Sequence, residues 1–340
     1  MNNIYNLGLE DLEEYFVSIG EKKFKGQQVF DWLYRKKVKS FDEMTNLKKE
    51  VIEVLKSNFT MNSISITKVE RDVDVNKYLF RLKDDEKVEA VLMDHLYGNS
   101  LCISTEVGCN MGCKFCESGR LKKIRNLETH EMIEQILLVE EECGKRISHI
   151  VIMGIGEPFD NYDNVIKFIE IVNNPKGLEL GSRHITVSTC GLVPKIREFT
   201  ELPYQVNLAI SLHAPTNEIR NTIMPINKAY PIEVLMDALK DYIKKTNRRV
   251  TFEYILLDNV NDTEECAIKL AELVRGMNCY INLIPYNETN NISYKRSKMS
   301  QISKFYDILK KNRINVTVRR EYGSNISAAC GQLRSKKEDE

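Results

Sequence analysis

At residues 150–158 the chain reads Ile150-Val151-Ile152-Met153-Gly154-Ile155-Gly156-Glu157-Pro158, a short apolar run that ends in a glycine-rich turn. An unbroken apolar run of this length is typical of a strand that is buried on both faces of a parallel sheet. Comparable runs predict strands at 101–105, 148–153, 184–189, 206–212, 250–257 and 279–285, followed by a last strand at 314–320. Helical periodicity between the strands is clearest at 130–142, 162–173, 232–245, 264–275 and 299–312.

This alternation of strands and helices predicts the fold class. Repeated strand–helix units with right-handed crossovers form a parallel sheet that curls toward a barrel. Six units are too few for the eight-stranded barrel. We therefore expect an α/β protein built on a partial (βα)6 barrel.

The residues before the predicted barrel do not follow its alternation of strands and helices. Residues 9–57 carry apolar side chains at helical spacing, and a polar turn at 83–86 separates strand-like runs at 78–82 and 87–93. Such a pair of runs predicts a β-hairpin. We expect three parts: a small helical accessory domain with a β-hairpin extension at 1–94, the barrel core at 95–323, and a C-terminal segment at 324–340.

The composition of the 340 residues excludes several classes of protein. Lys and Arg number 49, as do Asp and Glu, and 42% of the residues are hydrophobic, as in an ordinary globular protein. No apolar run approaches the ~18 residues of a membrane span, and the N-terminus has no secretory pattern. We therefore expect a cytoplasmic protein without a membrane partner. In that compartment clustered cysteines indicate a metal site or catalysis rather than disulfides.

Three of the nine cysteines form the strongest motif, a CxxxCxxC run at Cys109, Cys113 and Cys116 that follows the first core strand. Three thiolates within eight residues can bind one soft metal centre. A structural zinc site would need a distant fourth ligand. An iron–sulfur cube held by three cysteines would instead leave one iron open to a small molecule. Both kinds of site remain open on spacing alone.

Polar residues recur where the other strands end. Gly156 and Glu157 follow the second strand, Ser188 ends the third, and Ser211 and His213 end the fourth. A single hydroxyl or imidazole in such a place could simply cap a helix. Because the carboxyl ends of barrel strands meet at one mouth, the repetition predicts a shared site there.

The cysteine motif, with an aromatic residue just before its third cysteine, resembles that of the radical S-adenosylmethionine (SAM) superfamily. From about residue 25 to 334 the chain resembles one branch of it, the RlmN/Cfr-type RNA adenosine methyltransferases. The segments that carry this resemblance lie at 26–34, 88–91, 211–215, 224–227, 282–287 and 327–333. The chain departs from the family pattern at Glu106 and Glu117, which place carboxylates beside the cysteine loop.

The resemblance implies two cofactors. Cys109, Cys113 and Cys116 would bind a [4Fe-4S] cluster, and an electron from a donor such as flavodoxin or ferredoxin would cleave SAM to a 5′-deoxyadenosyl radical. The residues expected to bind SAM are Gly156, Glu157, Ser188, Ser211, Leu212, His213 and Asn287.

The resemblance also implies a mechanism that consumes two SAM molecules. The first would methylate Cys330, and the radical from the second would activate that methyl group, which then adds to carbon 2 of an adenine. Cys102 would form a disulfide with Cys330 and so release the product. Glu89 would accept the proton from the base.

The expected substrate is an adenosine of 23S ribosomal RNA in the peptidyl-transferase centre, and in several family members also an adenosine beside the tRNA anticodon. Residues 1–94 would contribute to RNA recognition, and we expect a monomer. The zero net charge is a sum of separate blocks, because residues 128–142 carry six Glu and residues 295–320 carry nine Lys or Arg against one Asp. If these blocks flank one mouth, the basic block can contact phosphates.

Two other functions compete with this hypothesis. The resistance branch of the same family methylates carbon 8 of adenosine, but it usually lacks the proline found here at Pro285. A zinc-stabilised RNA-binding protein without catalysis is the alternative from another class.

Overall fold

The computed structural model describes residues 1–289, 292–319, 326 and 332–333. Its centre is a single curved sheet, whose ten strands in this part of the chain follow the order β14-β13-β12-β11-β10-β9-β6-β5-β4-β3. Seven of these strands are parallel to their neighbours in the barrel half: β6 (Gly98–Cys102), β9 (Ile147–Ile152), β10 (Ile185–Thr189), β11 (Asn207–Ser211), β12 (Val250–Leu256), β13 (Cys279–Pro285) and β14 (Val316–Val318). The predicted partial barrel is therefore confirmed.

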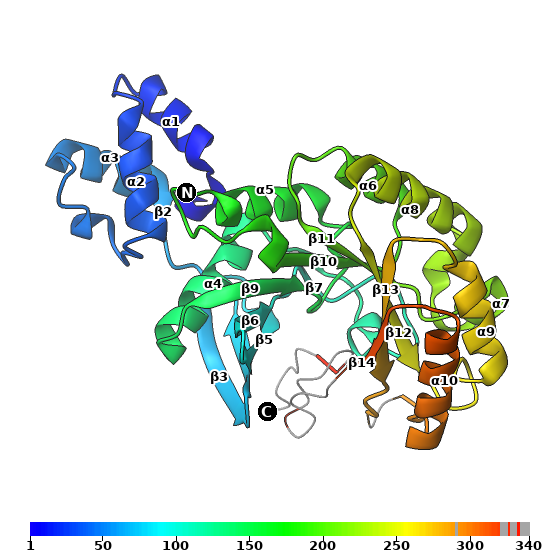
Figure 1. Cartoon of the computed structure of the whole chain (residues 1–340). Helices are drawn as coiled ribbons and strands as arrows, with labels where there is room; N and C mark the ends of the chain where they lie inside the picture. The colour runs from blue at the N-terminus through cyan, green and yellow to red at the C-terminus, as the bar shows by residue number, and fades with distance from the viewer. Residues whose placement is uncertain (290–291, 320–325, 327–331, 334–340) are drawn as a thin grey trace.

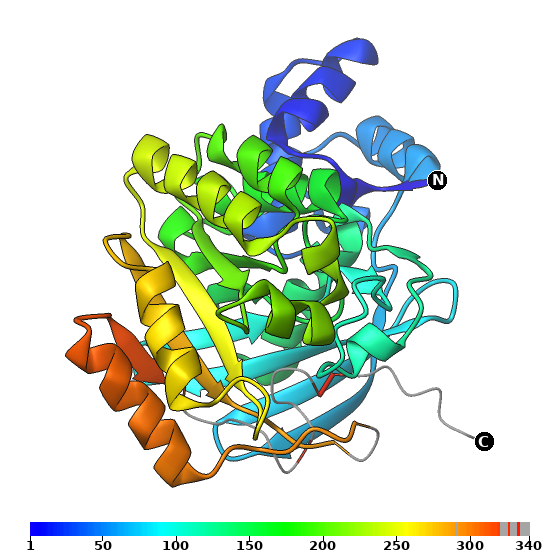
Figure 2. The ribbon, with the colours of Figure 1, turned by 90° about the vertical axis from the view of Figure 1, so that its right-hand side faces the viewer.

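The connecting helices lie outside the barrel strands, as Figures 1 and 2 show. They are α4 (Thr129–Cys143), α5 (Tyr162–Asn173), α6 (Val193–Thr200), α7 (Asn217–Ile223), α8 (Ile232–Thr246), α9 (Glu264–Leu273) and α10 (Met299–Lys311). Except for α7, each of these helices contributes its buried face to the main hydrophobic core. In α8, for example, Leu235, Leu239 and Tyr242 recur at helical spacing and are buried, while Lys240 and Lys244 are exposed. Burying such side chains contributes about 1.5–3 kcal/mol each.

The sheet continues beyond β6 as an antiparallel extension, formed by β5 (Lys87–His95), β4 (Val75–Arg81) and β3 (Ser65–Asp72). The predicted hairpin is β4 and β5. The sequence did not predict β3, because its side chains are only partly buried and lack a clear alternation. The expected boundary at residues 94 and 95 falls inside β5, and the division into three parts stays a prediction.

A helical N-terminal region lies above α4 and α5 (Figure 1). It contains α1 (Leu9–Ser18), α2 (Phe24–Tyr34) and α3 (Lys49–Asn58), with a short ladder between β1 (Asn2–Asn3) and β2 (Phe59–Thr60). A second ladder, β7 (Glu106–Val107) with β8 (Arg125–Asn126), closes the loop that carries the cysteine motif. In the described part of the chain, no helix has the length and apolarity needed to cross a membrane.

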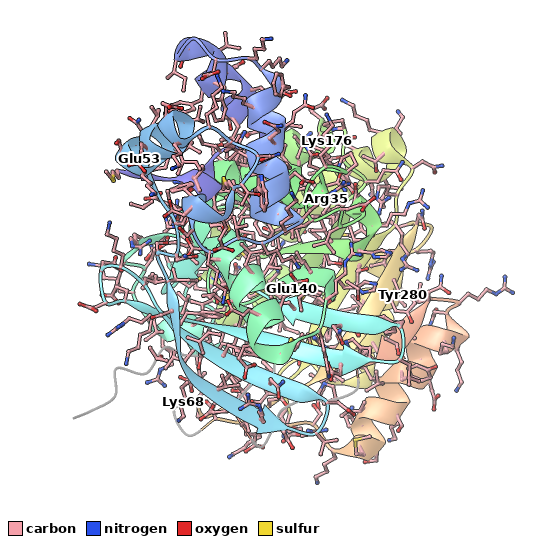
Figure 3. All side chains as sticks on the ribbon, turned by 90° about the vertical axis from the view of Figure 1, so that its left-hand side faces the viewer. Arg35, Glu53, Lys68, Glu140, Lys176 and Tyr280 are labelled. Carbon is pink, nitrogen blue, oxygen red and sulfur yellow. The ribbon has the colours of Figure 1, made fainter. Side chains whose placement is uncertain are left out.

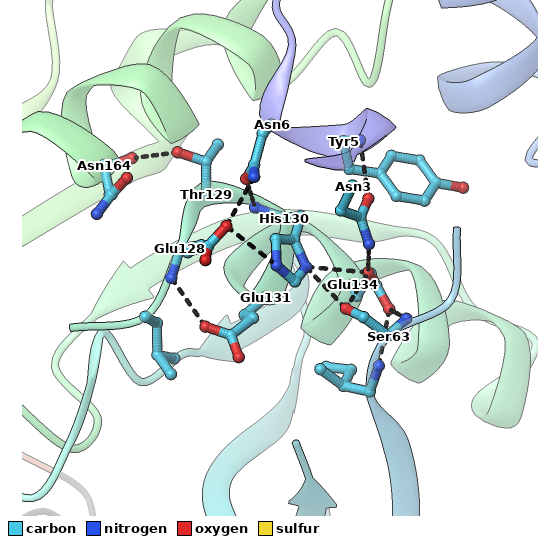
Figure 4. A network of polar contacts seen from close by, with 12 residues as sticks. Asn3, Tyr5, Asn6, Ser63, Glu128, Thr129, His130, Glu131, Glu134 and Asn164 are labelled. Atoms are coloured by element: carbon cyan, nitrogen blue, oxygen red, sulfur yellow. Dashed lines mark hydrogen bonds and ion pairs between the residues drawn. The ribbon is translucent and has the colours of Figure 1, made fainter. Parts of the chain in front are cut away.

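Polar contacts attach the N-terminal region to the barrel. Arg35 donates to the carbonyl of Pro175 at 2.7 Å, and Lys37 pairs with Glu140 on α4 (Figure 3). Glu134, also on α4, is buried and accepts hydrogen bonds from Asn3 Nδ2 at 2.8 Å and from the amide of Ser63 at 2.6 Å (Figure 4). One carboxylate thus holds both ends of the N-terminal region.

We predict that Glu134→Ala lowers the free energy of unfolding of the N-terminal region by about 2–4 kcal/mol, because the buried donors lose their acceptor. The single tryptophan, Trp32, lies on α2, so its fluorescence during urea unfolding reports on this region. Glu141→Ala is the matched control on the same helix, since Glu141 is half exposed and pairs only with Lys39 at the surface. We expect it to cost less than about 1 kcal/mol. Equal losses in the two variants would contradict this role of Glu134.

Candidate active site at the carboxyl ends of the barrel strands

The three motif cysteines share one cavity. Cys109, Cys113 and Cys116 line a hollow of about 910 Å³, open mouth included, at the carboxyl ends of the parallel strands. The residues from the strand ends that line it with them are Met153, Gly154, Gly156, Glu157, Pro158, Ser188, Cys190, Ser211, His213, Glu253, Ile255, Ile284 and Arg319. The structure therefore brings together most of the site residues that the sequence predicted.

Glycines set the shape of the cysteine loop. Gly112 has a φ of +65°, a left-handed conformation that side chains disfavour. At Gly119 a Cβ atom would lie 2.6 Å from the carbonyl oxygen of Cys113, so only glycine allows this approach. The loop is fixed to α7 because the amide of Lys114 donates to the carbonyl of Ile223 at 2.9 Å.

The chemistry of the sulfur atoms fits an iron–sulfur cluster. Burial raises the pKa of the Cys109 thiol to about 12 and that of Cys113 well above its usual range, so these thiols keep their protons until a metal centre replaces them. Among the described residues, no three His, Cys, Asp or Glu side chains converge on a point where one metal ion could bind. A cubane cluster does not require such convergence, because each cysteine binds a different iron atom.

Glu157 is held rigidly at the cavity wall. It is buried, and its two carboxylate oxygens accept hydrogen bonds from the amides of Phe159, at 3.0 Å, and Cys190, at 2.8 Å. Burial raises its pKa, while these two hydrogen bonds lower it. Next to it, Gly156 has a φ of +110°, and a Cβ atom there would lie 2.6 Å from Cγ of Glu106.

Glu106 lies beneath this turn, a role that sequence reasoning missed. The amide of Glu157 donates to Glu106 Oε2 at 3.0 Å, and Lys123 Nζ lies 2.6 Å from Glu106 Oε1 and 2.6 Å from Asp160 Oδ2. Burial raises the pKa of Glu106 to about 7, although Lys123 opposes this shift. The departure from the family pattern thus supports the glycine turn directly.

His213 is a neutral donor at the mouth. Its φ is +55°, and its Nδ1 accepts a hydrogen bond from the amide of Ile255 at 3.0 Å, which leaves the ring proton on Nε2. Burial, and after it the charge of Arg220, lower the pKa of His213 to about 3. Phe115 contacts the imidazole edge-on at 4.8 Å between ring centres.

Two of the predicted SAM residues do not line the cavity. The side chain of Leu212 is buried in the main hydrophobic core, its amide donates to the carbonyl of Glu253 at 3.1 Å, and its carbonyl accepts from Arg220 Nε at 3.0 Å. Asn287 lies beyond the end of β13 and is largely buried. Their assignment to SAM stays a prediction.

Glu89 and Cys102 lie on one face of the sheet beside the cavity. Cys102 is directly opposite Val91, and Glu89 precedes Val91 by two residues, which places all three side chains on the same face. Lys77 Nζ lies 3.5 Å from Glu89 Oε1, a contact that sequence reasoning also missed.

The C-terminal segment reaches the same face. Ile326 and Leu333 pack in one apolar cluster with Cys102 and Met153, and Ser118 Oγ donates to the carbonyl of Leu333 at 2.7 Å. Cys330 lies between them in the sequence but outside the described residues, so its predicted role stays a prediction.

We predict that Glu106→Gln changes how stability depends on pH. Between about pH 4.5 and 7 the folded chain holds a proton on Glu106 that the unfolded chain has released, so Glu106 lowers stability as the pH rises through this range. The stability of Glu106→Gln relative to the native chain should therefore increase by about 1–3 kcal/mol from pH 5 to pH 8. Urea unfolding at these pH values measures the difference, with the exposed Glu14→Gln as control. Parallel pH curves for Glu106→Gln and the native chain would contradict the assignment.

Comparisons with known proteins show which family the chain resembles. Residues 103–271 match the radical SAM superfamily, and residues 2–61 match the N-terminal domain of ribosomal RNA large subunit methyltransferases. The chain is 54% identical to a probable dual-specificity RNA methyltransferase RlmN of Spiroplasma citri, over 99% of both chains, and 53% identical to one of Listeria monocytogenes, over 98% of this chain and 94% of the other.

A solved structure supports the same relationship. The crystal structure of a radical SAM methyltransferase from Sphaerobacter thermophilus superposes with a TM-score of 0.94 at 39% identity, covering 99% of this chain and 100% of that one. The similarity extends over the N-terminal region, the barrel and the antiparallel extension. The chain therefore belongs to the RlmN family of radical SAM RNA methyltransferases.

Proposed function

We propose that this chain methylates carbon 2 of an adenosine in 23S ribosomal RNA, in the peptidyl-transferase centre, and also an adenosine beside the tRNA anticodon. The dual specificity named for its relatives supports the two RNA classes. One observation carries the proposal: the three cysteines and Glu157 line a single cavity, and the sheet face beside that cavity presents Glu89 and Cys102.

Membership of the radical SAM family implies a [4Fe-4S] cluster and SAM. We assign the cluster to Cys109, Cys113 and Cys116, whose thiols line the cavity wall. The bound cluster and SAM would supply one-electron chemistry that no side chain can provide alone. The reducing electron would come from a low-potential donor such as flavodoxin or ferredoxin.

The strand ends would orient SAM. Glu157 is fixed by two main-chain amides and can accept hydrogen bonds from the ammonium group of SAM, while Ser188 and Ser211 offer hydroxyl groups from neighbouring strands. His213 can only donate at Nε2, because Nδ1 is occupied by the amide of Ile255. Such fixed donors and acceptors cost little reorganisation when the ligand binds.

Three further residues would carry the methyl group and the proton. The Cys330 thiol would first lose its proton, and the thiolate would then attack the methyl carbon of SAM, so that a new carbon–sulfur bond forms, the sulfonium–methyl bond breaks and S-adenosylhomocysteine leaves. Glu89, held by Lys77, would accept the proton from carbon 2 of the adenine. The Cys102 thiolate would then attack the sulfur of Cys330, which forms the disulfide and breaks the bond between that sulfur and the methylene carbon on the base; this carbon would take up a proton and leave as the methyl group of the product.

The charge around the mouth supports RNA binding. Arg319 lines the cavity, and the segment that leads to it from residue 295 is rich in Lys and Arg. Cations at this place can contact phosphates while the target base enters the cavity unstacked. We assign residues 1–94 to RNA recognition as well, and we expect a cytoplasmic monomer.

The position of the new methyl group tests the proposal. Ribosomal RNA and tRNA from a bacterial strain that lacks the enzyme, complemented with this gene, should carry methyl groups on carbon 2 of the two adenosines by nuclease mapping and mass spectrometry. A methyl group on carbon 8 would assign the chain to the resistance branch instead. Unmethylated RNA of both classes, together with a colourless zinc protein, would overturn the enzyme assignment.

We predict that Cys330→Ala and Cys102→Ala each lower product formation by at least about 10³-fold. The first variant lacks the thiol that accepts the methyl group, and the second lacks the thiol that releases the product. Iron content and the absorbance of the reconstituted cluster should not change. Cys143→Ala is the control, since Cys143 lies at the far end of α4 and should leave turnover unchanged. Product formation by Cys330→Ala at more than a tenth of the native rate would contradict the methyl-cysteine mechanism.

A further inference from the structure

Arg220 on α7 is a charged side chain that the proposed mechanism does not use. It is completely buried, with a relative exposure of 0%, and is the largest such side chain in the described part of the chain. Its guanidinium donates to the carbonyls of Cys190 at 2.6 Å, Ser211 at 3.1 Å and Leu212 at 3.0 Å, and to Asn227 Oδ1 at 3.0 Å. All four acceptors are neutral.

The surroundings of Arg220 belong to the cysteine loop. Ile223 and Met224, one turn further along the chain, pack in an apolar cluster with Phe115, Cys113 and Cys116. The amide of Lys114 donates to the carbonyl of Ile223. The helix that carries Arg220 is thus the wall against which the loop is built.

A buried charge of this kind needs an anion. Removing an ion from water costs several kcal/mol, and hydrogen bonds to neutral carbonyls offset only part of that cost. Burial lowers the pKa of Arg220, but a guanidinium keeps its proton in proteins, so the charge cannot be lost by deprotonation. None of the ion pairs found in the described residues includes Arg220.

Glu157 does not neutralise Arg220 directly. The two side chains bind opposite ends of the peptide at Cys190: Arg220 binds its carbonyl, and Glu157 accepts from its amide. Ile223 and Met224, which follow Arg220 in the chain, pack against Cys113 and Cys116. The anion that balances Arg220 is therefore to be sought at the cysteine loop.

We propose that Arg220 is the buried counter-charge of the cluster that Cys109, Cys113 and Cys116 would bind, and that it raises the reduction potential of that cluster. A cluster held by thiolates is anionic and gains one more negative charge on reduction. A fixed cation nearby stabilises the reduced form more than the oxidised form. Arg220 is a positioning residue in this role, because it touches neither SAM nor RNA.

The inference rests on the proposed function, because it requires the cluster. A purely structural role for Arg220 is the competing explanation, since its four hydrogen bonds connect the ends of β10 and β11 to residue 227. The two explanations differ in one measurable property. Only the counter-charge role makes the reduction potential depend on the charge at residue 220 rather than on the hydrogen bonds.

The test is an anaerobic redox titration of the reconstituted full-length protein without SAM, in which the reduced cluster is followed by electron paramagnetic resonance. We expect Arg220→Gln to lower the ratio of reduced to oxidised cluster at a fixed potential by at least about tenfold, which is about 59 mV for one electron. Arg220→Lys keeps the charge and should recover most of that ratio. Arg248→Gln removes a half-buried arginine at the opposite end of the barrel and should change the ratio less than about twofold.

A second pair of variants keeps Arg220 in place. Asn227→Asp sets a carboxylate against the guanidinium and should lower the ratio in the same direction as Arg220→Gln. Asn227→Ala loses the same amide donors, to Asn217 and Asn221, without adding charge, and should leave the ratio within about twofold. This pair decides the question even if Arg220→Gln fails to fold.

The outcomes separate this inference from the proposed function. A cluster in Arg220→Gln or Asn227→Asp with an unchanged potential would overturn the counter-charge role, as would equal shifts in Asn227→Asp and Asn227→Ala. A native chain that takes up no iron would contradict the proposed function itself.

Discussion

The site depends on one constraint: the main-chain groups where the parallel strands end must find partners without water. Beyond their last ladder bonds, these amides and carbonyls point into a largely buried region. Buried polar side chains satisfy them. Glu157 accepts from two amides, Arg220 donates to three carbonyls, and Asn261 donates to the carbonyls of His213 and Ile255, each at 2.7 Å.

This arrangement makes the mouth of the barrel rigid before any ligand arrives. Side-chain hydrogen bonds connect the loops after β9, β10, β11 and β12 to one another: Glu157 accepts from the amide of Cys190, Arg220 donates to the carbonyl of Cys190, and Asn261 donates to the carbonyl of His213. His213 illustrates the consequence. Its left-handed backbone is maintained because the amide of Ile255 and the side chain of Asn261 bind the residue from both sides. The cost of ordering the site is therefore met during folding rather than during SAM binding.

Much of the barrel could be predicted from the sequence because its strands are buried on both faces. The predicted strand at 184–189 matches β10 to within one residue, since Val187, Ser188 and Thr189 are buried in succession, as expected of a strand covered on both faces. The strand β3 was missed because it lies at the edge of the sheet, where exposed and partly buried side chains follow one another without a regular alternation. A short helix such as α6 leaves too few turns for its periodicity to stand out.

The parts of the site that lie within one short segment could be predicted from the sequence, whereas the contacts between distant segments could not. The cysteine motif and the Gly156-Glu157 turn are short segments, so their spacing alone reveals them. Arg220 lies in the segment Asn217-Glu218-Ile219-Arg220-Asn221, which reads as a solvated helix. Its burial depends on carbonyls that come from two other loops. Lys123 and Glu106 meet in the same way, across a loop that folds back on itself.

The acidic residues at 128–142 also pair with cations that are distant in the sequence. The six glutamates at 128–142 do not face the basic segment across the mouth; instead, α4 packs beneath the N-terminal region, where Lys37 pairs with Glu140 and Lys39 with Glu141. Arg71 on β3 pairs with Glu142. Much of the acidic block is thus neutralised by neighbouring cations away from the cavity. Because these pairs cancel locally, a chain with zero net charge can still place a cation, Arg319, in the lining of the cavity.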